Sequence, residues 1–263
     1  MSIRVGVFGA GGRMGATVCK AVAADPELEL VAAVDPSHDG LAARTVIGVD
    51  DASFDVSGSP SAMTQAEVEV AIDFTAPDAA RDNITFCAQN GIHAVVGTSG
   101  FTESEFETIG KQFSRSNCLI APNFAIGAVL MMRFAEMAAP FFETAEIIEF
   151  HHNLKVDAPS GTAVNTAERM AAASSSWAPD PTETETLPGG RGARGPAGLP
   201  IHSIRMAGMV AHQEVVLGTT GQSLVIRHDT TDRSSFMPGV TLAAKRIADL
   251  PGLTIGLEPI LGL

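Results

Sequence analysis

The stretch Ile3-Arg-Val-Gly-Val-Phe-Gly-Ala-Gly-Gly-Arg-Met-Gly15 stands near the start of the chain and decides which fold we expect. Its first six residues have the composition of a short buried strand, and a helical run follows over residues 16–24. Gly9, Gly12 and Gly15 occupy the turn between them. In a dinucleotide site, such glycines permit the turn, the approach of the pyrophosphate and the packing of helix on strand. The order strand, glycine turn, helix therefore predicts a dinucleotide-binding unit.

A second strand is expected at residues 28–34, and it ends in Asp35, 20 residues beyond Gly15. At this position a carboxylate can accept hydrogen bonds from the adenosine ribose of the cofactor. Asp35 therefore favours NADH. The alternative is that Asp35 only starts a turn over residues 35–38.

The pattern of strands and helices continues through the first half of the chain. We expect strands at residues 68–74, 93–97 and 118–120, and a helix at 77–90 that is closed by Gly91. Residues 36–66 are acidic, small and polar, and they predict a mobile connection with at most one short strand. Alternating strands and helices indicate a Rossmann-like α/β domain with a mostly parallel sheet.

The second half predicts an α+β domain with a mixed or antiparallel sheet. We expect helices at 127–139 and 162–171, a strand at 145–150, and strands at 201–206, 210–217 and 222–228 that form its antiparallel companion. Met131, Met132 and Met137 are interpreted as core residues. The segment of residues 177–200 is too long for a simple connection. We expect a flexible surface loop, or alternatively a lid or an arm exchanged between subunits.

A helix at 238–249 and a strand at 253–257 are expected to return to the first domain. The predicted organisation is therefore a dinucleotide-binding domain of residues 1–124 and 236–263, with a substrate-binding and oligomerisation domain of residues 125–235.

The window from Glu149 to Ala163 carries the densest set of titratable groups in the chain. It reads as a strand end, a polar turn and a helix start, where Ser160 or Thr162 can cap and Gly161 lets a ligand approach the backbone. Free N–H groups and the helix dipole at such a start attract an anion. Lys155 adds an ammonium four residues after His151. The window predicts a site where an acidic small molecule is bound and protonated.

Simpler interpretations exist for single residues of this window. Ser160 and Asp157 alone are more typical of capping and turns than of catalysis. His151 and His152 are adjacent on a strand and would point to opposite faces, so we predict no metal site. Ser160 lacks the Gly-x-Ser-x-Gly elbow of a serine hydrolase. The combination, rather than any one residue, indicates a functional site.

The run Glu149-x-His-His-x-x-Lys-x-Asp-x-Pro-Ser-Gly-Thr162 resembles the signature of the dihydrodipicolinate reductase family, and the resemblance extends over nearly the full chain. It implies that NAD(P)H reduces a cyclic, unsaturated imine dicarboxylate, formed by loss of water from a hydrated precursor, to tetrahydrodipicolinate for lysine synthesis through diaminopimelate. It also implies that His151 or Lys155 donates a proton, with Lys155 our first choice. His152, Gly161 and Thr162 would bind the substrate's carboxylates.

The resemblance also indicates a set of cofactor contacts in the first domain. Ser99 stands where the family has a second threonine, and Pro36 stands where many members carry an arginine for the 2′-phosphate of NADPH. Arg13 could replace that arginine, so the choice between NADH and NADPH stays open, with NADH slightly favoured. The expected contacts are Gly9, Ala10, Gly11, Gly12, Arg13, Met14, Gly15, Asp35, Gly97, Thr98, Ser99, Ala121, Pro122, Asn123 and Phe124.

Composition restricts the remaining possibilities. The 263 residues are 45% hydrophobic, enough for a full core, and the net charge of −13 argues against nucleic acid and anionic membranes as partners. No leader is recognisable, and the longest apolar region, residues 124–142, is interrupted by Arg133 and Glu136. Three scattered cysteines fit buried thiols in the cytoplasm. By resemblance, we expect a homotetramer.

Two other functions are compatible with the same residues. One is a different imine or aldehyde reductase that shares the cofactor domain. The other is a protein that senses NADH without turnover, against which the His-His-x-x-Lys pattern argues, because a sensor needs no proton donor.

Overall fold

A computed structural model describes residues 2–263 of the chain. It divides into two compact units. The first unit runs to Ile126 and resumes at Arg233–Leu263, and the second comprises Gly127–Asp232. Among the described residues, no helix is both long and apolar enough to cross a bilayer.

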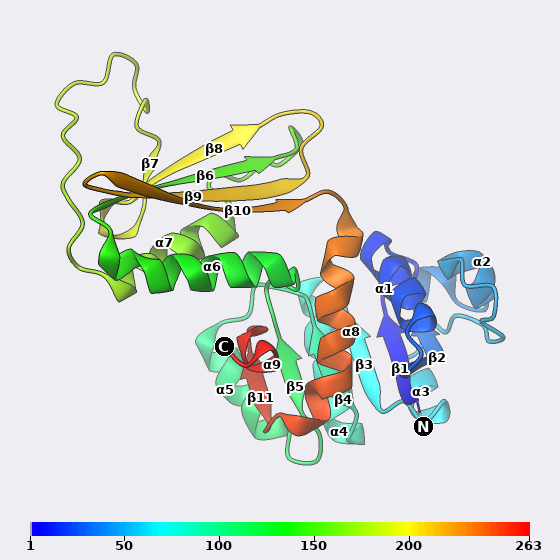
Figure 1. Ribbon diagram of the computed structural model, residues 1–263. Helices are drawn as coiled ribbons and strands as arrows, with labels where there is room; N and C mark the ends of the chain where they lie inside the picture. Colours follow the sequence, from blue (N-terminus) through cyan, green and yellow to red (C-terminus); the bar gives the residue numbers. More distant parts are fainter. Residues whose placement is uncertain (1) are drawn as a thin grey trace. The chain divides into compact units, whose positions relative to one another are not determined.

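The first unit is built on a sheet of six parallel strands (Figure 1). Their order is β11-β5-β4-β3-β1-β2, so the chain reverses its direction of travel across the sheet between β1 and β3. In open parallel sheets, ligands bind beside such a switch point at the carboxyl ends of the strands. The strands are β1 (Ile3–Phe8), β2 (Leu28–Val34), β3 (Val70–Asp73), β4 (His93–Val96), β5 (Cys118–Ile120) and β11 (Leu253–Ile255).

Helices cover both faces of this sheet. Along β4, Ala94 and Val96 belong to the core that α4 and α5 close, whereas Val95, which is equally buried, points to the opposite face. This two-sided burial explains why the strands are almost continuously apolar. The helices are α1 (Arg13–Ala24), α4 (Pro77–Asn90), α5 (Glu103–Gln112), α8 (Met237–Arg246) and the short α9 (Glu258–Leu261).

Two parts of the first unit differ from the sequence prediction. Residues 36–66 contain two short helices, α2 (Ala43–Ile47) and α3 (Ser61–Gln65), where we expected at most one strand. In place of the short strand that we considered for this region, Ser57 makes an isolated parallel bridge to Val34 of β2. Helix α5 was missed, although Thr102 and Glu105 form a complete capping box at its start.

The second unit holds a mixed sheet of five strands in the order β10-β9-β6-β8-β7. The expected hairpin is present, because β9 and β10 pair antiparallel. Strand β9 is antiparallel to β6, but β8 runs parallel to it, so the sheet is mixed, which is one of the two expected alternatives. A parallel pair needs a long connection, which the segment between β6 and β8 provides. The strands are β6 (Thr144–His151), β7 (Ala193–Arg194), β8 (Pro200–Arg205), β9 (Ala211–Thr219) and β10 (Gln222–Thr230).

Helices α6 (Ile126–Ala138) and α7 (Gly161–Ala173) lie together on one face of this sheet (Figure 1). They bury small residues against the strands, with Ala163 and Ala167 of α7 facing Ile147 of β6. Met131 and Met132 are buried as expected, but Met137 is 58% exposed. The prediction was wrong for Met137 because the 3.6-residue period turns it away from the face that carries Ala135 and Ala139.

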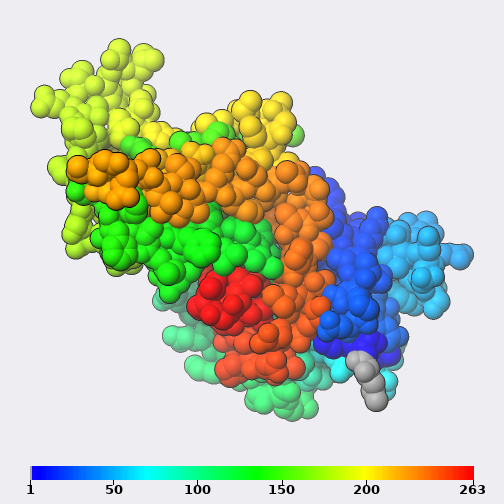
Figure 2. Space-filling model, in the orientation of Figure 1, coloured from blue at the N-terminus to red at the C-terminus, as the bar shows by residue number. Residues whose placement is uncertain are grey.

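Residues 174–192 form an extended segment between α7 and β7 that protrudes from the second unit (Figure 2). It contains no helix or strand. The short 3-10 helices of the chain lie elsewhere, at Pro36–His38, Ala139–Phe141, Pro196–Gly198, Arg233–Phe236 and Ile247–Asp249.

The close approach of α1 to the glycine turn gives a direct test of the fold. A Cβ at Gly15 would lie 2.0 Å from the carbonyl oxygen of Gly9, a backbone atom that cannot move aside. We expect Gly15→Ala to lower the free energy of unfolding by about 1–3 kcal/mol. Urea titration followed by circular dichroism measures it. Gly110→Ala is the control, because its Cβ would meet nothing closer than 3.7 Å; equal stability of the two variants would contradict the argument.

Candidate active site

The glycine turn after β1 leads into the uncapped start of α1. Gly9 has a φ of 68°, which a glycine adopts without strain. Gly12 is the N-cap of α1, and no side chain caps the amides of the first turn. These amides and the positive end of the helix dipole are therefore available to an anion. Ala10 and Gly11 belong to this turn, and Arg13 and Met14 are the first two residues of α1.

Asp35 lies directly after β2 and is tied to this turn. Its two carboxylate oxygens accept hydrogen bonds from the backbone N–H groups of Gly11 and Ser37, each at 2.9 Å. His38 Nδ1 lies 3.1 Å from the same carboxylate. Burial would raise the pKa of Asp35, but the hydrogen bonds from His38, Ser37 and Gly11 outweigh it and lower that pKa. Asp35 is thus an ionised acceptor beside the glycine turn.

The turn interpretation of Asp35 is confirmed, because the residue is the N-cap of the 3-10 helix Pro36–His38. The two roles are compatible, since a carboxylate has about four lone-pair sites and can accept further hydrogen bonds. Sequence reasoning missed the contact with His38. The sequence did contain a signal for this contact, because His38 follows Asp35 by three residues within a turn.

The two segments expected to contact the nicotinamide follow β4 and β5. Gly97 has no room for a side chain, because a Cβ would lie 2.1 Å from the ring of Phe74. Thr98 is buried and donates to the Thr75 carbonyl oxygen at 2.7 Å. Ser99 is exposed.

After β5, Ala121 is buried and Pro122 is exposed. The side chain of Asn123 accepts from the Ala125 N–H at 2.9 Å, and Phe124 is buried. Because all six strands are parallel, the ends of β1, β2, β4 and β5 lie at one edge of the sheet, so the first unit brings its predicted residues together.

In the second unit, the end of β6 carries a buried carboxylate. Glu149 is fully buried and accepts from both terminal nitrogens of Arg205, at 2.7 and 2.8 Å. His151 Nδ1 lies 2.5 Å from the same carboxylate. Burial would raise the pKa of Glu149, but hydrogen bonds from Arg205, Ser203 and His151 outweigh it and lower that pKa.

The imidazole of His151 is subject to opposing influences. Burial lowers its pKa, and the positive charges of Lys155 and Arg205 act in the same direction. The hydrogen bond and the negative charge of Glu149 oppose them, but the pKa still falls below its ordinary value. His151 is therefore mainly neutral at pH 7 in the ligand-free protein.

The turn between β6 and α7 holds the ammonium of the motif. Lys155 Nζ donates to both carboxylate oxygens of Asp157, at 2.8 and 2.7 Å. His152 lies beyond the end of β6 and is exposed. Asp157 is 61% exposed, so its pairing with Lys155 faces solvent.

Helix α7 begins at the end of this turn. Ser160 is its N-cap, as one of the two expected alternatives, and its hydroxyl accepts from the Ala163 N–H at 3.2 Å. Gly161 and Thr162 are the first two helical residues. Around a Cβ built at Gly161 there is no other atom within 4 Å, so the start of the helix is open. The turn that carries Lys155 thus joins the end of β6 at His151 to this helix start.

Glu149, Arg205 and Asp157 are contacts that the sequence prediction did not assign. Glu149 is the first residue of the motif that ends at Thr162, but the sequence prediction gave it no function. Arg205 is reached only through the register of the sheet, in which His151 pairs with Arg205 across β6 and β8. That register could not be read from the sequence, because β8 was expected to be antiparallel.

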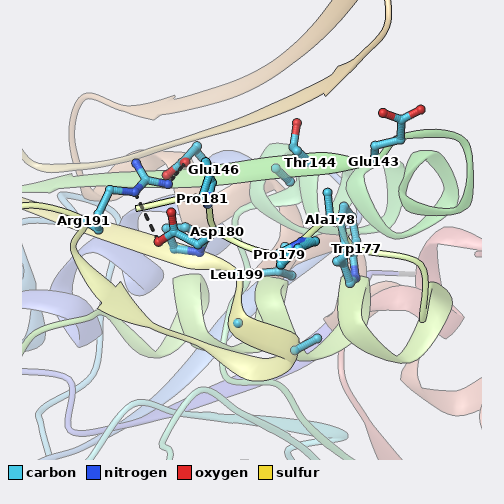
Figure 3. Close-up of a pocket in the computed structure, with 14 residues that line it drawn as sticks. Glu143, Thr144, Glu146, Trp177, Ala178, Pro179, Asp180, Pro181, Arg191 and Leu199 are labelled. Carbon is cyan, nitrogen blue, oxygen red and sulfur yellow. Dashed lines mark hydrogen bonds and ion pairs between the residues drawn. The ribbon is translucent and has the colours of Figure 1, made fainter. Parts of the chain in front are cut away.

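The second unit also contains a pocket away from these residues (Figure 3). It is open to solvent and is lined by Trp177, Asp180 and Arg191 among others. Glu146 of β6 reaches it from the face of the strand opposite to Glu149, since side chains alternate along a strand. None of the predicted substrate-binding residues lines this pocket.

Comparison with known proteins agrees with this architecture. The profile described as "Dihydrodipicolinate reductase, N-terminus" matches residues 3–124, and "Dihydrodipicolinate reductase, C-terminus" matches residues 127–261. The 4-hydroxy-tetrahydrodipicolinate reductase of Corynebacterium urealyticum is 50% identical, with 99% of each chain covered. That of Mycobacterium marinum is also 50% identical and covers 99% of this chain and 100% of its own.

Among solved structures, a dipicolinate-bound dihydrodipicolinate reductase from Paenisporosarcina sp. TG-14 has a TM-score of 0.87 and 39% identity, with 99% of this chain and 100% of that chain covered. Fold and similarity together define an NAD(P)H-dependent oxidoreductase. The chain belongs to the dihydrodipicolinate reductase family, which confirms the resemblance seen in its motif.

Proposed function

We propose that this chain reduces 4-hydroxy-2,3,4,5-tetrahydrodipicolinate to 2,3,4,5-tetrahydrodipicolinate, with loss of water, in lysine synthesis through diaminopimelate. The observation that carries the proposal is the grouping of the Lys155 ammonium, the His151 imidazole and the open start of α7 in one turn. The same chain has a glycine turn suited to a dinucleotide. An anion site, a proton donor and a nicotinamide-binding unit are what this reduction requires.

The bound nicotinamide cofactor supplies the hydride. The uncapped first turn of α1 binds the pyrophosphate through its backbone amides, and Gly15 lets that helix approach the turn. Asp35 accepts hydrogen bonds from the adenosine ribose. The segments Gly97–Ser99 and Ala121–Phe124, at the ends of β4 and β5, contact the nicotinamide half.

The substrate is a dianion, and the residues around α7 bind its carboxylates. The amides of Gly161 and Thr162 lie in the first turn of a 13-residue helix, where the dipole favours negative charge. His152 is exposed in the same turn and adds a hydrogen-bond donor. A carboxylate can also take the place of Asp157 beside Lys155, because Asp157 presents the same chemical group from a solvent-exposed position.

Lys155 donates the proton that completes the reduction. Hydride addition to the conjugated imine leaves an enamine, so a proton must reach carbon. The lowered pKa of His151, caused first by burial, leaves this imidazole mainly neutral at pH 7, whereas Lys155 Nζ is a hydrogen-bond donor positioned by both oxygens of Asp157. His151 then orients the substrate and assists the transfer.

NADH is the preferred cofactor, although Arg13 allows NADPH to bind. A carboxylate at Asp35 accepts from the free ribose hydroxyls of NADH, whereas the 2′-phosphate of NADPH is repelled by it. Pro36 cannot neutralise that phosphate. Arg13, the first residue of α1, is the cation in the glycine turn.

We further propose a homotetramer that assembles through the sheet of the second unit. Helices α6 and α7 cover one face of that sheet. By strand alternation and register, Ile148, Val216 and Val225 share the other face, and Val225 is 52% exposed. Light scattering should give the mass of four chains, and a monomer would exclude this assembly. The three free, buried cysteines support a location in the cytoplasm.

The direct test of the reaction is an assay in which an aldolase-type synthase generates the unstable substrate in place. Loss of nicotinamide absorbance is followed with NADH and NADPH in turn. We expect turnover with both cofactors and a higher kcat/KM with NADH. Turnover only with other imines or aldehydes would identify a different reductase, and binding of NADH without turnover would indicate a sensor.

Lys155→Ala tests the proton donor. We expect kcat to fall by about 10²- to 10⁴-fold, the usual contribution of general acid catalysis, with little change in the KM for NADH. Lys111→Ala, an exposed lysine in the last turn of α5, is the matched control and should behave like the parent. Equal kcat values in Lys155→Ala and the parent would exclude the role.

Asp35→Ala tests the choice of cofactor. Loss of a charged acceptor for the ribose hydroxyls should weaken NADH binding roughly tenfold and weaken NADPH less. Nicotinamide fluorescence titrations give both dissociation constants. Asp50→Ala removes a carboxylate at an exposed position and is the control. If the ratio of the two constants stays as in the parent, Asp35 has only its capping role.

A further inference from the structure

We propose that Glu149 and Arg205 are the positioning residues of this site: Glu149 fixes the orientation of His151 and anchors the turn that carries Lys155, and Arg205 balances its charge. This inference rests on the proposed function of His151 and Lys155. It concerns residues that do not themselves touch the substrate in that proposal.

Glu149 joins three segments that are distant in sequence. Besides His151 on its own strand, its carboxylate accepts from Arg205 at the end of β8 and from the Ser160 N–H at the start of α7, at 3.1 Å. The group is fully buried. An unpaired carboxylate in such a place would cost several kcal/mol, so each of these donors is held firmly to it.

The contact with Glu149 decides which nitrogen of His151 is available for chemistry. An ionised carboxylate is an acceptor only, so Nδ1 must carry a hydrogen. Nε2 then faces away from Glu149 and is the nitrogen that can meet a ligand. Without the carboxylate, the imidazole could rotate or exchange its proton between the two nitrogens. The same logic orients histidines in catalytic triads and metal sites.

Arg205 extends the anchor to the turn between β6 and α7. Its Nη2 donates both to Glu149 and to the carbonyl oxygen of Asp157, the latter at 2.8 Å. Asp157 in turn holds the Lys155 ammonium. Two routes therefore connect Glu149 to this turn: one through Ser160 at its end, and one through Arg205 at Asp157. Both hold the backbone of the turn that carries Lys155 to the strand that ends in His151.

A second carboxylate on β6 provides an internal comparison. Glu146 also pairs with a histidine and an arginine, His202 at 2.6 Å and Arg191 at 2.5 Å. Figure 3 shows Glu146 with Arg191 in the pocket described above. This group is 34% exposed and lies on the opposite face of the strand. Strand β6 thus carries two glutamates that each pair with a histidine and an arginine, one inside the motif and one outside it.

The charged groups that face His151 determine the sign of the expected effect. They are Glu149 on β6, Arg205 on β8 and Lys155 in the turn, and their influences on its pKa oppose one another. Glu149 is the group that raises the pKa of His151. Replacing it by glutamine removes that negative charge while keeping the shape, so His151 should titrate at lower pH.

The experiment compares the parent, Glu149→Gln and Glu146→Gln as full-length proteins. Nuclear magnetic resonance of 15N-labelled histidine side chains gives the titration of His151, assigned with His151→Asn among the seven histidines of the chain. The coupled assay gives kcat and KM. In Glu149→Gln we expect His151 to titrate at lower pH and kcat to fall roughly 10- to 100-fold, with the KM for NADH unchanged. Glu146→Gln should match the parent in both, with its assembly size checked by light scattering.

Unchanged titration of His151 in Glu149→Gln, or an equal loss of kcat in Glu146→Gln, would overturn the inference. If Glu149→Gln does not fold, the double variant Glu149→Gln, Arg205→Met removes both charges and leaves neither unpaired. Its kcat should fall in the same range while its melting temperature stays near that of the parent. A folded double variant with the parent's kcat would also overturn the inference. The histidine titration can be measured without enzyme turnover. If the parent protein shows no activity in the coupled assay, the proposed function is refuted, but the titration still tests the role of Glu149.

Discussion

The second unit depends on the hydrogen bonds that surround the buried carboxylate of Glu149. A charge placed out of water is stable only when donors surround it, and here they come from β6, β8 and the start of α7. The parallel pairing of β6 with β8 places Arg205 beside His151 and so supplies one of these donors. The requirement to satisfy one acid therefore shapes the sheet, the turn and the first residues of the helix together.

The first unit meets a different constraint, that of bringing backbone amides close to an anion. A parallel sheet places all its carboxyl ends at one edge, and the glycine turn after β1 begins α1 there without a side-chain cap. Asp35 closes the arrangement by accepting the Gly11 N–H, so the turn is held from β2 as well as from β1. The start of α1 thus has no side-chain cap, whereas in the second unit Ser160 caps α7 and Glu149 accepts from the Ser160 N–H.

The sequence predicted these two sites unequally. The glycine turn, the Glu149–Thr162 motif and the apolar strands were readable because each is local, a few residues with a fixed spacing. Arg205 and the direction of β8 were not, since they depend on pairing between segments separated by about fifty residues. Helix α5 was missed despite the local signal of Thr102 and Glu105, and residues 36–66 were underestimated because two five-residue helices leave little periodicity.

A net charge of −13 must be reconciled with an anionic substrate and an anionic cofactor. At physiological salt, charges on the surface act over about 8 Å, so the local arrangement outweighs the total. Within the second unit, Glu149 compensates Arg205, and Asp157 compensates Lys155, which leaves the start of α7 as the uncompensated positive region. A dianion that displaces Asp157 removes one of these compensations and adds negative charge near His151. The added negative charge favours the imidazolium form of His151, whereas the uncompensated Lys155 ammonium opposes it.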